Sequence, residues 1–237
     1  DASLTSDVLV LADLRGIDSH GVARLRRYYT GLKNGVMVPN PQIKVVQETP
    51  ITARIDAGAA LGQVAGVRGM NMAIEKALKN GIGLVSVGNS NHFGIAAYYA
   101  LMALKHDLIG ISLTNSDCYT VPTFGREVLL GTNPICVSLP SGEERAFVLD
   151  MSTAVATLGK LEVYSRMAKK IPLGWAVDEK GRSCDDPQRV LQNIRNKTGG
   201  GLLPLGGEGE IHGGHKGYGL NLLVDILSGV LSGSGYL

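Results

Sequence analysis

The sequence predicts an α/β fold, and three observations support this prediction. The chain has 237 residues, of which 44% are hydrophobic and 19% are charged, so it can bury a sizeable core. Residues 82–114 follow the order strand, polar loop, helix, strand, which is typical of a βαβ unit. Upstream of this unit, residues 43–47 and 52–56 alternate apolar and polar side chains, as half-buried strands do.

Local patterns support each element in turn. Apolar residues at helical spacing predict helices over residues 3–14 and 22–32. A third helix covers the apolar positions from Val64 to Leu78 and ends at Gly81, because glycine adopts the left-handed conformation that closes a helix. The remaining predicted elements are, in order, a strand at 82–87, a helix at 95–106, strands at 109–114 and 146–149, and an apolar helix at 220–231. That last helix has few polar residues, so we expect it to be buried in the core or in a subunit contact.

Charge and cysteine content exclude several classes of protein. The formal net charge is +2, and no block of Lys or Arg alternates with aromatic residues, which argues against nucleic acid or an anionic membrane as a partner. The three cysteines lack Cys-x-x-Cys spacing, so neither a disulfide framework nor a thiolate metal site is predicted. The apolar segment 220–231 is too short to span a membrane. We expect a cytoplasmic protein that acts on small molecules.

Two histidines lie in polar, glycine-bounded segments that suit a catalytic site. His20 ends the run Gly16-Ile-Asp-Ser-His, and His92 lies in Asn89-Ser-Asn-His-Phe-Gly. Arg24 follows His20 by four residues and therefore shares its helical face, and Tyr28 extends the row by a turn. Imidazole exchanges protons near neutral pH and guanidinium binds carboxylates through two parallel bonds. The pattern predicts a site that binds a carboxylate and moves a proton, although helix capping and loop capping would also explain these residues.

Polar or glycine-rich segments also follow predicted strands or precede a predicted helix. Ser116 follows the strand at 109–114, and Asp150-Met-Ser follows the strand at 146–149. Residues 206–219 are rich in glycine and carry Lys216, and such a segment before a helix suits a phosphate. Neither Gly-x-Gly-x-x-Gly nor a Walker loop occurs, so pattern alone does not establish a nucleotide cofactor. A turn serine and a helix cap remain structural alternatives for Ser116 and for the 150–152 segment.

Six motifs in this order resemble one enzyme family. They are Asp13-Leu-Arg-Gly-Ile-Asp-Ser-His-Gly, Asn91-His-Phe-Gly, Gly131-Thr-Asn-Pro, Leu149-Asp-Met-Ser-Thr, Ile171-Pro-Leu-Gly-Trp-Ala and Gly214-His-Lys-Gly-Tyr-Gly. Together they resemble the malate/L-lactate dehydrogenase family that is distinct from the classical Rossmann dehydrogenases. This family also includes L-sulfolactate, ureidoglycolate and piperideine-2-carboxylate oxidoreductases. The resemblance extends over essentially the whole chain.

The resemblance implies a fold, a reaction and a set of site residues. The implied fold is a non-Rossmann NAD(P)-binding α/β fold with a mixed sheet and flanking helices, which accounts for the missing glycine fingerprint. The implied reaction transfers a hydride between a nicotinamide and a small 2-hydroxy or 2-oxo acid. By motif position His92 is the expected proton acceptor, and His20, Arg24 and Tyr28 are expected to bind the substrate. The expected cofactor contacts are Ser116, Asp150, Met151, Ser152, His215, Lys216 and Gly217.

The resemblance also implies an organisation and an assembly. Residues 1–57 form an N-terminal helical and strand segment that carries the substrate-binding residues, and residues 58–237 form the cofactor-binding α/β body. Members of the family are homodimers, so a homodimer is expected. The chain begins at Asp1 without Met and within a helical pattern, and we therefore expect incomplete ends.

A metal-dependent hydrolase or lyase is the alternative that the residues leave open. Its ligands would be Glu208, Glu210, His212 and His215, which have ligand-type side chains and lie close together in the sequence. Within the dehydrogenase interpretation, the sequence distinguishes neither NAD from NADP nor one 2-hydroxy acid from another. The Glu208-Gly-Glu-Ile-His segment resembles the malate and sulfolactate branch and favours a dicarboxylate-like acid.

Overall fold

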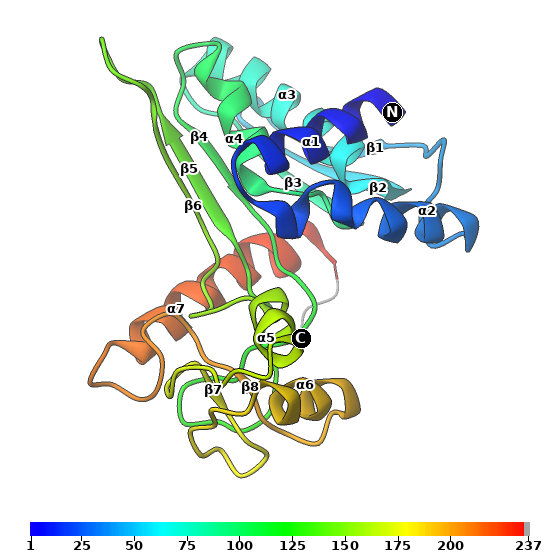
Figure 1. Cartoon of the computed structure of the whole chain (residues 1–237). Helices are drawn as coiled ribbons and strands as arrows, with labels where there is room; N and C mark the ends of the chain where they lie inside the picture. Colours follow the sequence, from blue (N-terminus) through cyan, green and yellow to red (C-terminus); the bar gives the residue numbers. More distant parts are fainter. Residues whose placement is uncertain (235–237) are drawn as a thin grey trace. The chain divides into compact units, whose positions relative to one another are not determined.

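The computed structural model describes residues 1–234, and its contacts divide the chain into two compact units (Figure 1). Unit 1 comprises Asp1–Ser112, Cys136–Asp150 and Ser228–Ser234. Unit 2 comprises Leu113–Ile135 and Met151–Leu227. The predicted division between residues 57 and 58 falls within a strand of unit 1, and it stays a prediction about how substrate and cofactor contacts are distributed along the chain.

The N-terminal part of unit 1 is helical, as predicted. Helix α1 spans Ala2–Leu14, and short 3-10 turns η1 (Asp18–His20) and η2 (Val22–Arg24) lead into α2 (Leu25–Lys33). The helix predicted over 22–32 therefore begins as a tighter turn. The Asp13 carboxylate accepts a hydrogen bond from the Val22 N–H at 3.0 Å, which ties the η2 turn to the end of α1.

A three-stranded mixed sheet forms the centre of unit 1. Strand β1 (Lys44–Glu48) pairs antiparallel with β2 (Thr52–Ala60), and β2 pairs parallel with β3 (Leu84–Ser90). Helix α3 (Gly62–Asn80) connects β2 to β3 and ends at Gly81, whose φ of 84° is left-handed as predicted. A Cβ at Gly69 would lie 2.8 Å from the Val87 side chain, so α3 packs closely on the sheet only because this residue is glycine.

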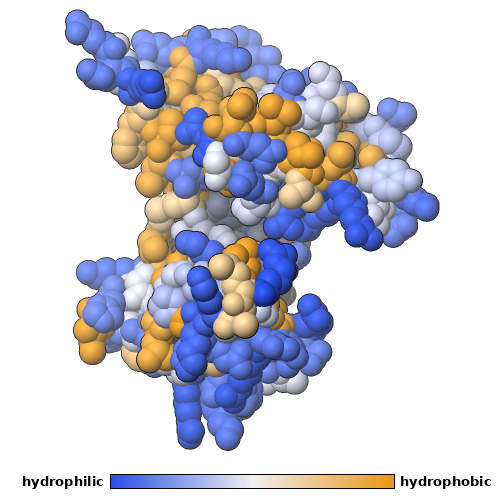
Figure 2. Space-filling view, in the orientation of Figure 1, coloured by the Kyte–Doolittle hydropathy of each residue, from blue (hydrophilic) through white to orange (hydrophobic). Residues whose placement is uncertain are grey.

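A second sheet contains β4 (Gly110–Leu113), β5 (Ile135–Leu139) and β6 (Phe147–Met151), in the order β4-β5-β6. Helix α4 (Ala96–Leu104) shares a buried cluster with this sheet through Ala97, Ala100 and Cys136. Exposed apolar residues, including Ile111 on β4 and Phe147 on β6, belong to unit 1. On the face shown in Figure 2, hydrophobic residues cover broader areas of unit 1, at the top of the view, than of unit 2.

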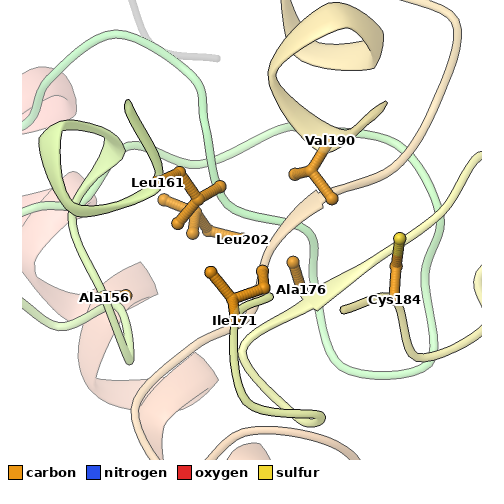
Figure 3. Packing of buried hydrophobic residues seen from close by; sticks show 7 residues of the cluster. All are labelled: Ala156, Leu161, Ile171, Ala176, Cys184, Val190 and Leu202. Carbon is orange, nitrogen blue, oxygen red and sulfur yellow. The ribbon is translucent and has the colours of Figure 1, made fainter. Parts of the chain in front are cut away.

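Unit 2 is organised around a small core beneath two short strands. Helices α5 (Leu158–Arg166) and α6 (Pro187–Asn196) pack beside β7 (Ala176–Val177) and β8 (Gly201–Leu202). Figure 3 shows the core, which contains Ala156, Leu161, Ile171, Ala176, Cys184, Val190 and Leu202. None of these four elements was predicted. Asp186 caps α6 by accepting hydrogen bonds from the Gln188 and Arg189 N–H groups, so α6 follows an ordinary capping rule.

The last helix differs from the prediction in its start, and its burial in a subunit contact stays a prediction. Helix α7 spans Gly214–Asp225 and continues as the π-helical turn η3 (Ile226–Val230), so it begins at Gly214 and not at Leu220. One face is buried through Asn221, Val224 and Asp225, whereas Leu223 is 50% exposed. Among the described residues, no helix combines the length and the apolar character that crossing a membrane requires.

Candidate active site

The loop after β3 holds His92 in a fixed position within unit 1. The side-chain amide of Asn91 donates hydrogen bonds to the backbone oxygens of Ala59 (3.1 Å) and Ala60 (3.0 Å) at the end of β2. The start of α3 lies directly against the same loop, because a Cβ at Gly62 would come within 2.0 Å of the Asn91 carbonyl oxygen. Glycine is therefore required there, and the His92 loop is anchored to both a strand and a helix.

Three of the predicted site residues meet around the His92 ring. The Tyr28 hydroxyl lies 2.6 Å from His92 Nδ1, and the Gly94 N–H donates to the same nitrogen at 3.3 Å. The His20 ring stacks on the His92 ring with 5.5 Å between the centroids and 20° between the planes. Residues from η1, α2 and the loop after β3 thus form one cluster, although they are far apart in the sequence.

Burial and positive charge keep both imidazoles neutral. Burial lowers the pKa of His92 to about 3, with further lowering from the charges of Arg27, His20 and Arg24. Burial, Arg24 and Arg27 likewise lower the pKa of His20. Burial also raises the pKa of the Tyr28 phenol to about 12. At neutral pH the cluster therefore combines neutral rings with nearby guanidinium charge, an environment that favours an anion.

Arg24 is oriented by a backbone contact. Its Nε donates to the Ser19 carbonyl oxygen, and its terminal nitrogens form no hydrogen bond with a residue in the described part of the chain. Arg27 was not predicted as a site residue, yet its charge lowers the pKa of His92 more than that of Arg24 does. Its position three residues after Arg24, on the same helical face, was the signal available in the sequence.

In unit 2, two predicted cofactor residues are held by residues 132–133 of the Gly131-Thr-Asn-Pro motif, to which the sequence analysis assigned no site role. Ser116 Oγ accepts a hydrogen bond from the Thr132 N–H at 3.0 Å, and Ser152 Oγ donates to the Thr132 carbonyl oxygen at 3.0 Å. The Asn133 side-chain oxygen also accepts from the Ser116 N–H at 3.1 Å. The loop after β4 and the end of β6 are therefore connected through residues 132–133.

The same asparagine connects these loops to α7. Asn133 Nδ2 donates to the Asn221 side-chain oxygen at 2.8 Å, and Asn221 Nδ2 donates to the Gly131 carbonyl oxygen at 2.9 Å. Asn133, Asn221 and Asp225 are all buried, and Asn133 Nδ2 also lies 3.4 Å from an Asp225 carboxylate oxygen. This buried network brings together, within unit 2, segments that the sequence analysis treated separately. The Gly131-Thr-Asn-Pro motif was the signal that could have identified it.

Asp150 and Met151, also predicted as cofactor contacts, have other surroundings than Ser116 and Ser152. Asp150 belongs to unit 1, where its carboxylate accepts a hydrogen bond from the Ala97 N–H at 3.0 Å in the first turn of α4. Burial raises the pKa of this carboxyl group, and the bond from Ala97 opposes that rise. Met151 is half-buried at the end of β6. Contact of either residue with a cofactor stays a prediction.

His215, Lys216 and Gly217 form the first turn of α7, not a loop. The N-cap residue Gly213 has a left-handed φ of 84° and offers no side chain to the free N–H groups of the first turn. Gly217 is buried, and a Cβ there would lie 1.8 Å from the Leu205 carbonyl oxygen. A cavity of about 470 Å³ adjoins this turn. It is lined by Leu205, Glu210, Ile211, His212, Gly213, Lys216, Gly217 and Leu220.

The alternative metal site finds no support in the described residues. Glu208, Glu210, His212 and His215 lie within or beside the segment that leads into α7. Across residues 1–234, no group of three or more His, Cys, Asp or Glu side chains is arranged to hold a metal ion.

Comparisons with known proteins agree with the fold and the motifs. The family model of malate/L-lactate dehydrogenases matches residues 1–237. The chain is 53% identical over 233 residues to a malate dehydrogenase of Pyrococcus abyssi, an alignment that covers 98% of this chain and 62% of that protein. It is 44% identical over 230 residues to the L-sulfolactate dehydrogenase of Methanocaldococcus jannaschii, which covers 97% of this chain and 62% of that protein.

Solved structures of malate dehydrogenases are also similar to this chain. The crystal structure of malate dehydrogenase from Entamoeba histolytica superposes with a TM-score of 0.94 at 41% identity, over 99% of this chain and 65% of that one. The α/β fold with mixed strand pairing and flanking helices is thus the fold predicted from the sequence. The chain spans a little under two thirds of the length of these curated relatives. It belongs to the malate/L-lactate dehydrogenase family.

Proposed function

We propose that the protein containing this chain is an NAD(P)-dependent oxidoreductase that transfers a hydride between a nicotinamide and C2 of a small 2-hydroxy or 2-oxo acid. The observation that carries this proposal is the contact of 2.6 Å between the Tyr28 hydroxyl and His92 Nδ1, beside the stacked ring of His20. Such a cluster places a proton-exchanging group next to guanidinium charge. The names of the relatives, malate and L-sulfolactate dehydrogenases, support the same reaction class.

In this proposal His92 is the acid/base catalyst. Nδ1 is engaged by Tyr28 and Gly94, so Nε2 is the nitrogen that faces the substrate oxygen. In the oxidation direction Nε2 accepts the hydroxyl proton as the hydride leaves C2, and in reduction the imidazolium returns that proton to the developing alkoxide. General acid/base catalysis of this kind contributes about 10²–10⁴-fold to a rate.

Arg24 and His20 bind the C1 carboxylate of the acid. The terminal nitrogens of Arg24 can bind a carboxylate through two parallel hydrogen bonds, and the bond from Nε to Ser19 orients the guanidinium. Arg27 supplies a second positive charge near His92. Two guanidinium groups suit a dianion better than a monoanion, so the proposal favours an acid of the malate or sulfolactate type over lactate.

The residues of unit 2 fit a nucleotide cofactor, and we assign its binding to them. Lys216 and the uncapped N–H groups of the first turn of α7 border a cavity, which is the donor set that a phosphate requires. Ser116, Ser152 and the backbone around Thr132 offer hydroxyl and amide groups nearby in the network. When bound, NAD or NADP supplies C4 of its nicotinamide as the hydride acceptor or donor. Met151, His215 and Gly217 of unit 2 are further proposed contacts, and so is Asp150 of unit 1.

We also propose a homodimer in a reducing compartment, the cytoplasm. The exposed apolar residues at the end of α7, such as Leu223 and Ile226, support a subunit contact there. The free cysteines Cys118, Cys136 and Cys184 support a compartment that keeps thiols reduced. Light scattering of the full-length protein tests the dimer.

Absorbance at the reduced-nicotinamide band tests the reaction. NADH and NADPH are each supplied with oxaloacetate, sulfopyruvate or pyruvate, for the wild type and for His92→Ala. We expect one cofactor to be oxidised with a dianionic acid and the rate to fall at least about 100-fold in the variant. Absence of oxidation with every pair would refute the proposed function, whereas an unchanged rate in His92→Ala would keep the reaction and remove His92 from its role.

A further inference from the structure

The side chain of Asp13 contacts the turn that carries His20 and Arg24. Its carboxylate accepts a hydrogen bond from the Val22 N–H at 3.0 Å. Asp13 lies in the last turn of α1, where a negative charge meets the unfavourable end of the helix dipole. The charge is therefore of no benefit to α1 itself, and the hydrogen bond to the following turn is the contact that calls for an explanation.

Gly21 leaves the space that the Asp13 carboxyl group fills. A Cβ at Gly21 would lie 1.7 Å from Asp13 Oδ1, 2.2 Å from Cγ and 2.6 Å from Oδ2. The φ of Gly21 is −85°, so glycine is required here for space and not for a left-handed backbone. A side chain at this position would displace the carboxylate from the Val22 N–H. Asp13 and Gly21 therefore form one structural unit.

The peptide group between Gly21 and Val22 is fixed on both sides. Its N–H donates to Asp13, and its carbonyl oxygen accepts a hydrogen bond from the Arg24 N–H at 2.9 Å. The Arg24 Nε also donates to the Ser19 carbonyl oxygen in the same turn. Because a peptide group is planar and rigid, the position of the Asp13 carboxylate determines that of the backbone from which the Arg24 side chain extends.

Helix α1 also contacts the segment that carries His92. A Cβ at Gly94 would lie 2.5 Å from the Val8 side chain, so α1 packs directly on the residues that follow His92. The residue before Asp13 is buried in one cluster with residues of α4, the next helix along the chain. One helix therefore holds the His92 segment through its apolar face and the Arg24 turn through Asp13.

We propose that Asp13 is a positioning residue that sets the separation between the Arg24 guanidinium and the His92 imidazole. This inference rests on the proposed function, in which Arg24 binds the C1 carboxylate and His92 exchanges a proton with the oxygen on C2. These two groups lie on adjacent carbon atoms, so their separation varies little among 2-hydroxy acids. A site that holds both groups for reaction needs the guanidinium and the imidazole at a matching separation. Asp13 provides it by attaching the Arg24 turn to the helix that packs beside His92.

A double-mutant cycle separates this role from a general loss of stability. Asp13→Ala removes the acceptor and Gly21→Ala displaces it. Each should lower kcat/KM for the 2-oxo acid about tenfold, since a misplacement of about 1 Å can cost up to about 10²-fold. The double variant should show the same loss as either single variant, because both substitutions break one contact. A loss in the double variant equal to the product of the two single losses, or no loss in either, would overturn the inference.

Two further variants identify what the Asp13 side chain contributes. Asp13→Asn keeps an oxygen that accepts the Val22 N–H, so we expect it to retain most of the wild-type kcat/KM. A loss as large as that of Asp13→Ala would show that the charge matters and not the hydrogen bond, which would overturn the inference. Asp7→Ala is the matched control, because Asp7 is an exposed carboxylate on the same helix. It should leave kcat/KM unchanged, and a tenfold loss there, as in Asp13→Ala, would also overturn the inference.

A measurement that needs no turnover completes the test. Amide hydrogen exchange of the full-length protein, followed by NMR, reports on the Val22 and Arg24 N–H groups. We expect both groups to exchange faster in Asp13→Ala and in Gly21→Ala, and at the wild-type rate in Asp13→Asn. Unchanged exchange in every variant would overturn the inference. If the wild type oxidises neither NADH nor NADPH with any acid, the proposed function fails by itself, and the exchange rates still decide whether Asp13 holds the turn.

Discussion

The acid/base cluster of unit 1 and the loop network of unit 2 use polar side chains in opposite ways. In unit 2, Asn133 satisfies its side-chain oxygen through Ser116 and its amide hydrogens through Asn221, and every bond is internal. In unit 1, His92 Nε2 and the terminal nitrogens of Arg24 have no hydrogen-bond partner among the described residues. The satisfied network fixes loops, whereas the unsatisfied cluster leaves capacity for a proton and an anion. In these two regions, the internally bonded network supports loops, and the cluster with open hydrogen-bonding positions is the proposed reacting centre.

Breaking the complete network should have the largest effect on stability. Asn133→Ala leaves the Ser116 N–H, in a part-buried position, and the buried Asn221 side-chain oxygen without their partner. At about 1–3 kcal/mol for each orphaned group, we expect about 3 kcal/mol of lost unfolding free energy. Urea denaturation measures this loss. If the variant is as stable as the wild type, the network does not support the loops as described.

Substitution in the incomplete cluster should instead affect catalysis. Arg24→Lys keeps the charge and loses the planar fork, so we expect a loss of about 1.5–3 kcal/mol in kcat/KM, or about 10- to 150-fold. The control is Arg26→Lys, an exposed residue two positions away to which we assign no role. Steady-state kinetics with the 2-oxo acid measures the difference. An equal response of both variants would place the carboxylate elsewhere.

Two buried tyrosines provide a matched pair within unit 1. Tyr28 contacts His92, whereas Tyr99 is equally buried and its hydroxyl donates to the Phe93 carbonyl oxygen. Each Tyr→Phe change removes one buried hydroxyl and its hydrogen bond. We expect kcat to fall about tenfold or more in Tyr28→Phe only, because general acid/base assistance is weakened there. Similar kcat values for the two variants would remove the Tyr28 hydroxyl from the reaction.

Close to neutral pH, the smallest expected effect is the dependence of stability on pH. Folding lowers the pKa of His92 from 6.5 to about 3. The unfolded chain therefore binds a proton as the pH falls below about 6.5, while the folded chain stays neutral at this residue down to about pH 3. Between these values the contribution of His92 reduces stability as the pH falls, by up to about 1.4 kcal/mol per pH unit. Thermal unfolding of His92→Asn, compared with the wild type from pH 7 to pH 4, should show a shallower decline.

Periodicity and motif order predicted most of unit 1 and little of unit 2. The helix ending at Gly81 and the strands around it follow hydrophobic spacing and a glycine C-cap, which are local rules. Strands β7 and β8 are two residues long and exist only through their mutual pairing, which no local pattern shows. Helix α7 begins within glycines that read as a loop, because Gly217 packs beneath Leu205 and tertiary contact overrides propensity.

The part of the candidate site that could be predicted consists of residues whose side chains have characteristic chemistry and occur in motifs. His20, Tyr28 and His92 were grouped by spacing and motif, and the structure brings the three together. Arg27 was missed because an exposed arginine on a helix looks like an ordinary surface charge. Asn133 was missed because its role depends on a partner 88 residues away, Asn221. Burial and long-range pairing are properties of the folded chain, and neither can be read from local composition.

The two hydrogen bonds of the Asn91 side chain affect when the His92 side chain loses its conformational entropy. Its amide joins the carbonyl oxygens of Ala59 and Ala60, and Gly62 closes the other side of the same loop. The imidazole that follows is thereby aimed before any ligand arrives. Its rotational freedom is lost when the chain folds, not when an acid binds, so the binding free energy of the acid remains available for stabilising the transition state.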